Sequence, residues 1–183
     1  ADIIGKGIPA ALCMSMIKYA MDGLHDQQLM PKDILRNLNH IVERNVDPGM
    51  FITMISGIYD VSQHRFLYAG AGHEPGFFYD REGEGLLDLE AEGLVLGVAR
   101  HVHYAEYRVD LNPGDAVILF SDGVTECRTD EGFLERSQLK GLIQQHMAKG
   151  AQDLAEAVFE ECLRLSNFEQ CDDHTMLLIR RSK

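Results

Sequence analysis

AVILFSDG, residues 116–123, joins an apolar run to a polar turn and decides both the fold and the candidate site. Five consecutive apolar residues, Ala116 to Phe120, followed by turn residues are typical of a buried strand. An Asp-Gly step often marks only a turn, so Asp122 has two equally good interpretations. It is either a plain turn residue or a carboxylate that a rigid strand delivers to the rim of the fold.

Two further segments place acidic residues where a strand meets a loop. Asp2 precedes the Gly-Lys-Gly loop 5–7, and Asp172 and Asp173 precede an apolar run that starts at Thr175. Each segment alone has a simpler interpretation, either a solvated turn or charges that protect a sheet edge. Together, carboxylates converging from several strand ends would form an all-oxygen site of the kind that hard divalent cations prefer.

The order of the periodic patterns predicts the fold class. Two helical patterns precede a run of strand patterns, and two more helical patterns precede a last strand, which differs from the βαβ alternation of a parallel sheet. With 183 residues, the chain is expected to form one domain, an α+β fold with antiparallel sheet packed against helices. The expected helices cover 8–24, 31–45, 137–147 and 151–165, and the expected strands cover 50–59, 65–71, 76–80, 86–89, 104–109, 116–120 and 174–180.

Composition excludes several classes of function. The formal net charge is −12 and no Lys/Arg cluster stands out, which disfavours binding to nucleic acid or to an anionic membrane. No apolar run approaches the roughly 20 residues of a membrane span. The four cysteines form no CxxC pair, and Cys171-x-x-His174 lacks a second ligand pair, which disfavours zinc. A reduced, cytoplasmic setting is therefore expected.

Histidines and lysines near glycines leave alternatives open. His73 lies in a glycine-rich turn and is either a proton donor or a structural residue. Lys6 either contacts a phosphate or is a solvated loop residue, since the loop 5–7 does not have the spacing of a Walker loop. His101 and His103 alternate along a strand-like segment without acidic or thiol partners, and both are expected at the surface.

The motifs in this order resemble the SpoIIE-type branch of the metal-dependent protein phosphatases (the PPM, or protein phosphatase 2C-like, family). The resemblance runs from residue 1 to about residue 181 and is carried by the segments DIIGKGIPAAL, MFITMISGIYD, YAGAGHEPGFF, GLVLGV, GDAVILFSDGVTE and DDHTMLLIRR. It implies a four-layer α-β-β-α sandwich in which two antiparallel sheets face each other with helices outside.

The resemblance also implies a site that binds two Mn²⁺ or Mg²⁺ ions bridged by a water. Asp2 would bridge the ions, the carbonyl of Ile3 would supply an oxygen, and Asp122 would bind one ion. The acidic pair would supply another ligand, with Asp172 favoured and Asp173 close behind. Asp2, Asp122 and Asp172 are thus the expected catalytic residues. Two metal ions can activate water and neutralise phosphoryl oxygens, a route that needs no covalent nucleophile.

The resemblance further implies a substrate and partners. The expected reaction is hydrolysis of phosphoserine on a STAS-type anti-anti-sigma protein, which activates the general stress response. Gly5, Lys6, Gly123 and His73 are the expected substrate-binding residues. A regulatory protein acting through an N-terminal domain would reposition the helices 8–24 and 31–45, although their periodicity alone indicates only amphipathic core helices. Homodimer formation is left open.

One departure from the family pattern leads to an alternative. The family places a further acidic ligand in a GG-D-x-Y-D-like strand, and this sequence starts one residue before Asp2. The chain is therefore expected to be a fragment, 1–183, that lacks the first strands, binds metal weakly and turns over little substrate. The alternative function is a catalytically incomplete module that binds a phosphoprotein or regulator. A metal-dependent nuclease is disfavoured by the charge of −12.

Overall fold

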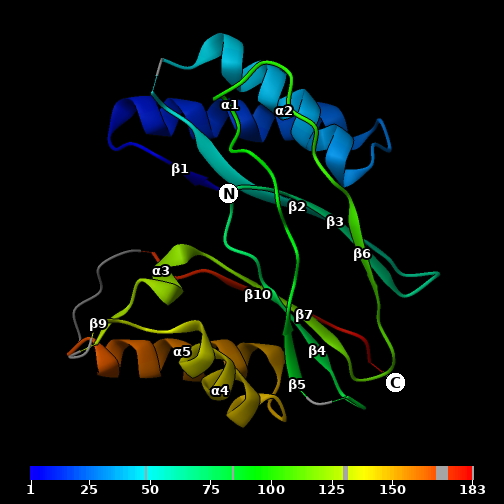
Figure 1. Ribbon diagram of the computed structural model, residues 1–183, viewed down its shortest axis with the longest axis vertical. Helices are drawn as coiled ribbons and strands as arrows, with labels where there is room; N and C mark the ends of the chain where they lie inside the picture. Colours follow the sequence, from blue (N-terminus) through cyan, green and yellow to red (C-terminus); the bar gives the residue numbers. More distant parts are fainter. Residues whose placement is uncertain (48, 84, 130–131, 168–172, 183) are drawn as a thin grey trace. The chain divides into compact units, whose positions relative to one another are not determined.

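The strand and helix patterns of the sequence form two units in a computed structural model of the chain (Figure 1). The structure describes residues 1–47, 49–83, 85–129, 132–167 and 173–182. Unit 1 contains Ala1–Pro75 and Glu90–Asp110, and unit 2 contains Gly76–Leu89 and Leu111–Lys183. The expectation of one domain over 1–183 stays a prediction.

Unit 1 is an antiparallel sheet with two helices packed on one face (Figure 1). Its strand order is β1-β2-β3-β6. The elements are β1 (Asp2–Ile3), α1 (Ile8–His25), α2 (Pro31–Asn45), β2 (Ile52–Asp60), β3 (Arg65–Ala71) and β6 (Tyr107–Asp110).

The core of unit 1 follows from helical spacing. Leu35, Leu38 and Val42 of α2 recur at i, i+3 and i+7 and are fully buried, because this spacing places them on one face. α2 begins at Pro31, whose fixed φ suits a first helical turn. The buried amide of Asn39 accepts from the N–H of Gly97 and donates to the carbonyl of Ala99, both at 2.9 Å. The segment before β6 is thereby attached to α2.

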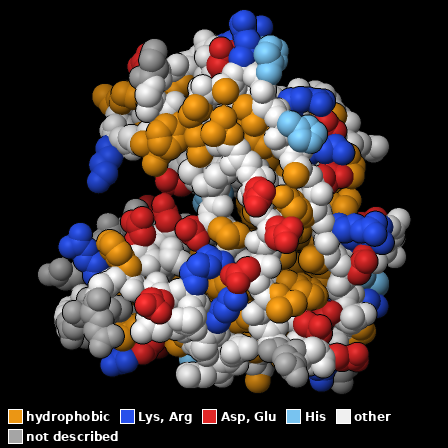
Figure 2. Space-filling view, in the orientation of Figure 1, with side chains coloured by type: hydrophobic (Ala, Val, Ile, Leu, Met, Phe, Trp, Pro, Cys, Tyr) orange, Lys and Arg blue, Asp and Glu red, His pale blue; other side chains and the backbone are white. Residues whose placement is uncertain are grey.

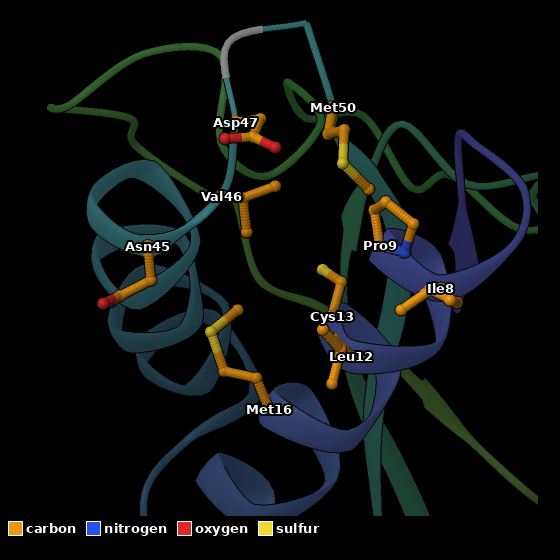
Figure 3. Close-up of a pocket in the computed structure, with 9 residues that line it drawn as sticks. All are labelled: Ile8, Pro9, Leu12, Cys13, Met16, Asn45, Val46, Asp47 and Met50. Atoms are coloured by element: carbon orange, nitrogen blue, oxygen red, sulfur yellow. The ribbon is translucent and has the colours of Figure 1, made fainter.

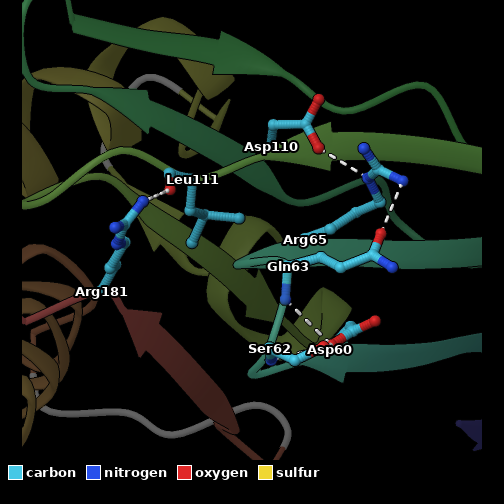
Figure 4. Close-up of polar contacts among 7 residues, drawn as sticks. All are labelled: Asp60, Ser62, Gln63, Arg65, Asp110, Leu111 and Arg181. Atoms are coloured by element: carbon cyan, nitrogen blue, oxygen red, sulfur yellow. Dashed lines mark hydrogen bonds and ion pairs between the residues drawn. The ribbon is translucent and has the colours of Figure 1, made fainter.

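A hairpin with its own polar contacts joins β2 to β3 (Figure 4). One carboxylate oxygen of Asp60 accepts from the backbone N–H and the hydroxyl of Ser62, at 2.8 and 2.6 Å, and from the N–H of Gln63 at 3.1 Å. The Ser62 hydroxyl and the Gln63 N–H lower the pKa of Asp60, since both bonds favour the charged form. Arg65 donates to Asp110 of β6 at 2.6 Å and so links β3 to β6.

Unit 2 is a second antiparallel sheet, with the order β10-β7-β4-β5, packed against two helices (Figure 1). A short helical turn and a two-stranded ribbon connect the sheet to these helices. The elements are β4 (Phe77–Asp80), β5 (Gly85–Asp88), β7 (Ala116–Phe120), α3 (Asp122–Thr125), β8 (Arg128–Thr129), β9 (Gly132–Phe133), α4 (Arg136–His146), α5 (Ala151–Leu165) and β10 (Met176–Arg180).

The apolar run 116–120 forms the inner strand β7. Ala116, Val117 and Ile118 are completely buried, which confirms the predicted buried strand. The turn before β7 is held by Asp115, a buried carboxylate that accepts from the backbone N–H groups of Arg81 and Asn112 at 2.9 and 2.7 Å. β7 is therefore fixed at its start, and Asp122 follows two residues after its end.

Asp88, the last residue of β5, attaches the sheet of unit 2 to α4. Its carboxylate accepts from Arg136 at 2.8 Å and from Lys140 at 2.6 Å. Burial pushes the pKa of Asp88 up, but the hydrogen bonds from Lys140 and Arg136 outweigh it, so the pKa is lowered. A lowered carboxyl pKa contributes stability above the unfolded-state pKa, and this contribution is lost as the pH falls through the folded-state value.

Asp88→Asn is therefore expected to lower the urea midpoint at about pH 6 and to have a smaller effect at about pH 3, where the carboxyl is increasingly protonated. Urea unfolding of both proteins at the two pH values measures this. An equal loss at both pH values would show that the charge of Asp88 contributes nothing.

The predicted α+β class with two antiparallel sheets is confirmed. The strand expected over 104–109 is wrong in its first half, because only Tyr107–Asp110 pairs with β3, whereas the side chain of Tyr104 is buried in the core of unit 1. His101 and His103 are exposed as expected, but they lie outside any strand. Neither α3 nor the β8–β9 ribbon was predicted.

Two cysteine side chains are part of the cores. Cys13 and Cys162 are buried in the two cores, and burial raises the pKa of Cys162 to about 12. Cys171 lies outside the described residues.

Within the described ranges, no helix is long and apolar enough to cross a bilayer.

Candidate active site

Asp122 is the first residue of α3, and only Ser121 separates it from the end of β7. Its carbonyl accepts from the N–H of Glu126 at 2.7 Å and from the hydroxyl of Thr125 at 3.1 Å, while its carboxylate accepts from the N–H of Gly123 at 3.0 Å. The side chain is half-buried. The strand and the helical turn thus fix the backbone of Asp122, as the functional interpretation of this motif requires.

The segment with Asp173 lies against this turn. Ser121 donates its backbone N–H to the carbonyl of Thr175 at 3.0 Å, and its hydroxyl accepts from the N–H of Thr175 at 3.0 Å. The same hydroxyl donates to the carbonyl of Asp173 at 3.0 Å. Unit 2 therefore brings two of the predicted ligands, Asp122 and Asp173, to one end of the β7–β10 pair. Asp172 lies outside the described residues.

Gly123 lets these two segments approach closely. It is buried, and a Cβ at this position would lie only 2.4 Å from the carbonyl oxygen of Asp173 and 3.3 Å from Cδ2 of His174. A residue without a side chain is therefore needed here. The structure gives Gly123 this packing role, and its predicted contact with substrate stays a prediction.

Unit 1 gathers a second set of predicted residues at one end of its sheet. Asp2 of β1 is the antiparallel partner of Thr53 in β2, and Ile3 is the partner of Ile52. The side chains of such partners lie on the same face, about 5 Å apart. The hydroxyl of Thr53 is hydrogen-bonded to Nδ1 of His73 at 2.9 Å. Asp2 and His73 are thus both neighbours of Thr53.

The loop 5–7 leads from β1 into the first turn of α1. Gly5 and Gly7 have φ values of 134° and 75°, a backbone region that favours glycine. Gly7 is the N-cap of α1, so no side chain caps the first helical turn. Lys6 is exposed. The N-terminus of an 18-residue helix attracts anions through its N–H groups and dipole.

The donor atoms fit Mg²⁺ or Mn²⁺. Carboxylates and a backbone carbonyl are the oxygen ligands that these hard ions prefer, and a zinc site would require Cys or His. Among the residues that the structure describes, no three His, Cys, Asp or Glu side chains form a group able to hold a metal ion. Asp2 belongs to unit 1, whereas Asp122 and Asp173 belong to unit 2.

Sequence reasoning missed two residues that hold site residues in place. Ser121 contacts the segment 173–175, and Thr53 contacts His73. Ser121 precedes an Asp-Gly step at the end of an apolar run, and a hydroxyl at such a strand-to-helix junction is a usable signal. No signal distinguishes Thr53 from other β-branched strand residues.

An apolar groove lies elsewhere in unit 1, between α1 and the segment after α2 (Figure 3). Its volume is about 340 Å³. Figure 2 shows hydrophobic side chains gathered over α1, where Ile8 and Leu12 are 77% and 66% exposed. The groove is lined by Ile8, Pro9, Leu12, Cys13, Met16, Asn45, Val46, Asp47 and Met50.

Solved structures define the class of this fold. The PP2C domain of SiaA from Pseudomonas aeruginosa matches 98% of this chain and 72% of its own with a TM-score of 0.83 at 22% identity. The catalytic domain of the serine/threonine protein phosphatase PstP, in complex with two manganese ions, matches 97% of this chain and 83% of its own with a TM-score of 0.68 at 15% identity. The fold is therefore that of the PP2C-type phosphatases.

The chain belongs to the SpoIIE (stage II sporulation protein E) family, whose model matches residues 1–182. It is 52% identical to the phosphoserine phosphatase RsbU of Bacillus subtilis (strain 168) over 181 residues, or 99% of this chain. The chain spans only about half of that relative, 54% of its length.

Proposed function

We propose that this domain is a Mn²⁺- or Mg²⁺-dependent phosphoserine phosphatase. The observation that carries the proposal is the placement of Asp122 and Asp173 at the shared end of β7 and β10, fixed by backbone and Ser121 hydrogen bonds. The 52% identity to a relative named phosphoserine phosphatase supports the same reaction, hydrolysis of the phosphate ester of a serine. Asp2 and the carbonyl of Ile3 in unit 1, and Asp122 and Asp173 in unit 2, supply the oxygen ligands that these ions prefer.

Asp2, the carbonyl of Ile3 and Asp122 are the proposed metal ligands, with a further ligand from the acidic pair. Asp172 is the favoured member of that pair and Asp173 the second. Two manganese ions are present in the PstP domain of the same fold, which supports a pair of ions here. When bound, the ions would neutralise phosphoryl oxygens and lower the pKa of a bound water.

The residues of unit 1 would act on the substrate. The loop with Gly5 and Lys6 and the N-terminus of α1 offer N–H groups and a positive charge to the phosphoserine phosphate. His73, oriented through Nδ1 by Thr53, would donate a proton to the serine oxygen as it leaves. Such proton donation contributes typically 10²–10⁴-fold to a rate.

The proposed substrate is a phosphorylated STAS-type anti-anti-sigma protein, whose release would activate the general stress response. A cytoplasmic setting fits, because Cys13 and Cys162 are buried thiols that form no disulfide. Substrate class is tested by incubating the full-length protein and Mn²⁺ with a phosphoserine-bearing STAS protein and, separately, with duplex DNA. Phosphate release from the phosphoprotein alone is expected. DNA cleavage, or binding of the phosphoprotein without release, would contradict the proposal.

We also propose that the exposed face of α1 receives the N-terminal regulatory domain through which an activating protein acts. The groove beside α1 and the exposed Ile8 and Leu12 provide an apolar surface large enough for a partner side chain. A partner bound here would act on the loop 5–7, because that loop leads directly into α1.

Leu12→Lys is therefore expected to reduce partner-dependent activation at least about tenfold, since a charge would be desolvated in the interface. The measurement is phosphate release with and without the activator. Gln152→Lys, on the exposed start of α5, is the control and should activate normally. Normal activation of the Leu12→Lys protein would remove α1 from the activating contact.

A further inference from the structure

Ser121 lies where β7 ends and α3 begins, and its hydrogen bonds depart from those of an ordinary strand residue. The antiparallel register pairs Phe120 with Met176, so Ser121 and Thr175 come next. In a hydrogen-bonded antiparallel pair, each residue donates its N–H to the carbonyl of the other. Ser121 donates to Thr175 in this way, but the Ser121 carbonyl accepts instead from the N–H of Val124, at 3.1 Å, within the α3 turn.

The Ser121 hydroxyl replaces the lost carbonyl. It accepts the N–H of Thr175 at 3.0 Å, which the turn into α3 would otherwise leave without its strand partner. It also donates its own proton to the carbonyl of Asp173 at 3.0 Å. A hydroxyl has one donor and two acceptor positions, so a single side chain satisfies both bonds. Alanine at this position would satisfy neither.

Gly123 completes this arrangement from the other side. Its missing Cβ leaves the space that the carbonyl group of Asp173 occupies, at 2.4 Å from the position of a Cβ. The Asp173 backbone is thus held by the Ser121 hydroxyl and packed against Gly123. We name Ser121, Gly123, Asp173 and Thr175 the clasp. Ser121 and Gly123 flank Asp122 in the sequence, so the clasp fixes the backbone of Asp173 relative to Asp122.

We propose that Ser121 is a positioning residue for a site that binds a metal ion through the carboxylates of Asp122 and Asp173. This inference rests on the proposed function, because it assumes that these carboxylates bind the metal. Metal ligands must be held within about 0.5 Å of their productive positions. Residues that orient ligands through hydrogen bonds typically change metal affinity 10- to 100-fold when they are mutated.

The test compares Ser121→Ala, Ser121→Thr and Ser121→Cys with the unchanged full-length protein. Mn²⁺ affinity is measured by calorimetry, and unfolding of the metal-free proteins is measured in urea. Ser121→Ala is expected to weaken Mn²⁺ binding about tenfold or more. Ser121→Thr keeps the hydroxyl and should restore most of the affinity, and the weaker thiol of Ser121→Cys should give an intermediate value. Ser137→Ala, which removes an exposed hydroxyl from α4, should bind normally.

Hydrogen exchange provides a second readout that needs no metal. The Thr175 amide should exchange faster in Ser121→Ala, at least about tenfold, while the Ile118 amide within β7 stays protected. If Ser121→Ala does not fold, the ranking of the Thr and Cys variants decides in its place.

Two results would overturn the inference. One is Mn²⁺ affinity within about twofold of the unchanged protein in Ser121→Ala, and the other is an equal loss in the Ala and Thr variants. Absence of Mn²⁺ binding to the unchanged protein would overturn both the inference and the proposed function. Mn²⁺ binding that depends on the Ser121 hydroxyl, without phosphate release, would overturn the proposed function alone.

Discussion

Asp122→Asn is expected to lower kcat/KM for Mn²⁺-dependent phosphate release at least about 100-fold. Loss of a residue that only hydrogen-bonds to a metal ligand already lowers metal affinity or activity 10- to 100-fold, and Asp122 is itself a proposed ligand. The substitution removes the charge and keeps the shape. The carbonyl of residue 122 can still accept from Glu126, and the amide oxygen can still accept from Gly123, so the fold should be retained.

The measurement is steady-state phosphate release from the phosphoserine substrate across a Mn²⁺ titration. Asp153→Asn is the matched control, because Asp153 is an exposed acidic residue in the first turn of α5 in the same unit. It should leave kcat/KM unchanged. Activity of Asp122→Asn within about threefold of the unchanged protein, at saturating and at limiting Mn²⁺, would remove Asp122 from the metal site.

Phe77→Ala is expected to lower the free energy of unfolding by about 3–5 kcal/mol, the usual range for a buried Phe. Phe77 is completely buried in β4, and its ring centroid lies 5.0 Å from that of Phe120 in β7. The guanidinium of Arg136 lies 4.7 Å from the ring centroid and the ammonium of Lys140 lies 5.2 Å from it. The ring therefore joins the sheet to α4, and its removal leaves a cavity and loses these contacts.

Urea unfolding of the two proteins measures this loss. Leu87→Ala is the control on the neighbouring strand β5, because Leu87 is 57% exposed and its truncation should change stability by no more than about 0.5 kcal/mol. A loss below about 1 kcal/mol in Phe77→Ala would show that Phe77 is not central to the core of unit 2.

Much of the fold followed from local periodicity. The run 116–120 predicted a buried strand because five apolar residues between turn signals have few other uses, and β7 has these bounds. The helices 31–45 and 151–165 were predicted with their observed ends, because Pro31 and the helical spacing of buried residues define them. The strand start at residue 104 was wrong, since a buried Tyr104 gives the same apolar signal inside or outside a ladder.

The candidate site was only partly predictable. The carboxylates were visible as acidic residues at strand ends, and Asp122 and Asp173 do lie at one end of the β7–β10 pair. The contacts that hold them were not visible, because Ser121 acts on a segment more than fifty residues away in the sequence. The hydrogen bond between Thr53 and His73 depends in the same way on strand register. The choice between Asp172 and Asp173 as ligand stays a prediction.

Phosphate release from a phosphoserine-bearing STAS protein, measured on the full-length protein with and without Mn²⁺, tests the central claim most directly. We predict release that requires Mn²⁺ or Mg²⁺, that stops when a chelator removes the ion, and that resumes when the ion is restored. Release that is unaffected by chelation would contradict a metal-dependent reaction. Stable binding of the phosphoprotein without release, at saturating Mn²⁺ and with the activating partner present, would instead identify a binding module.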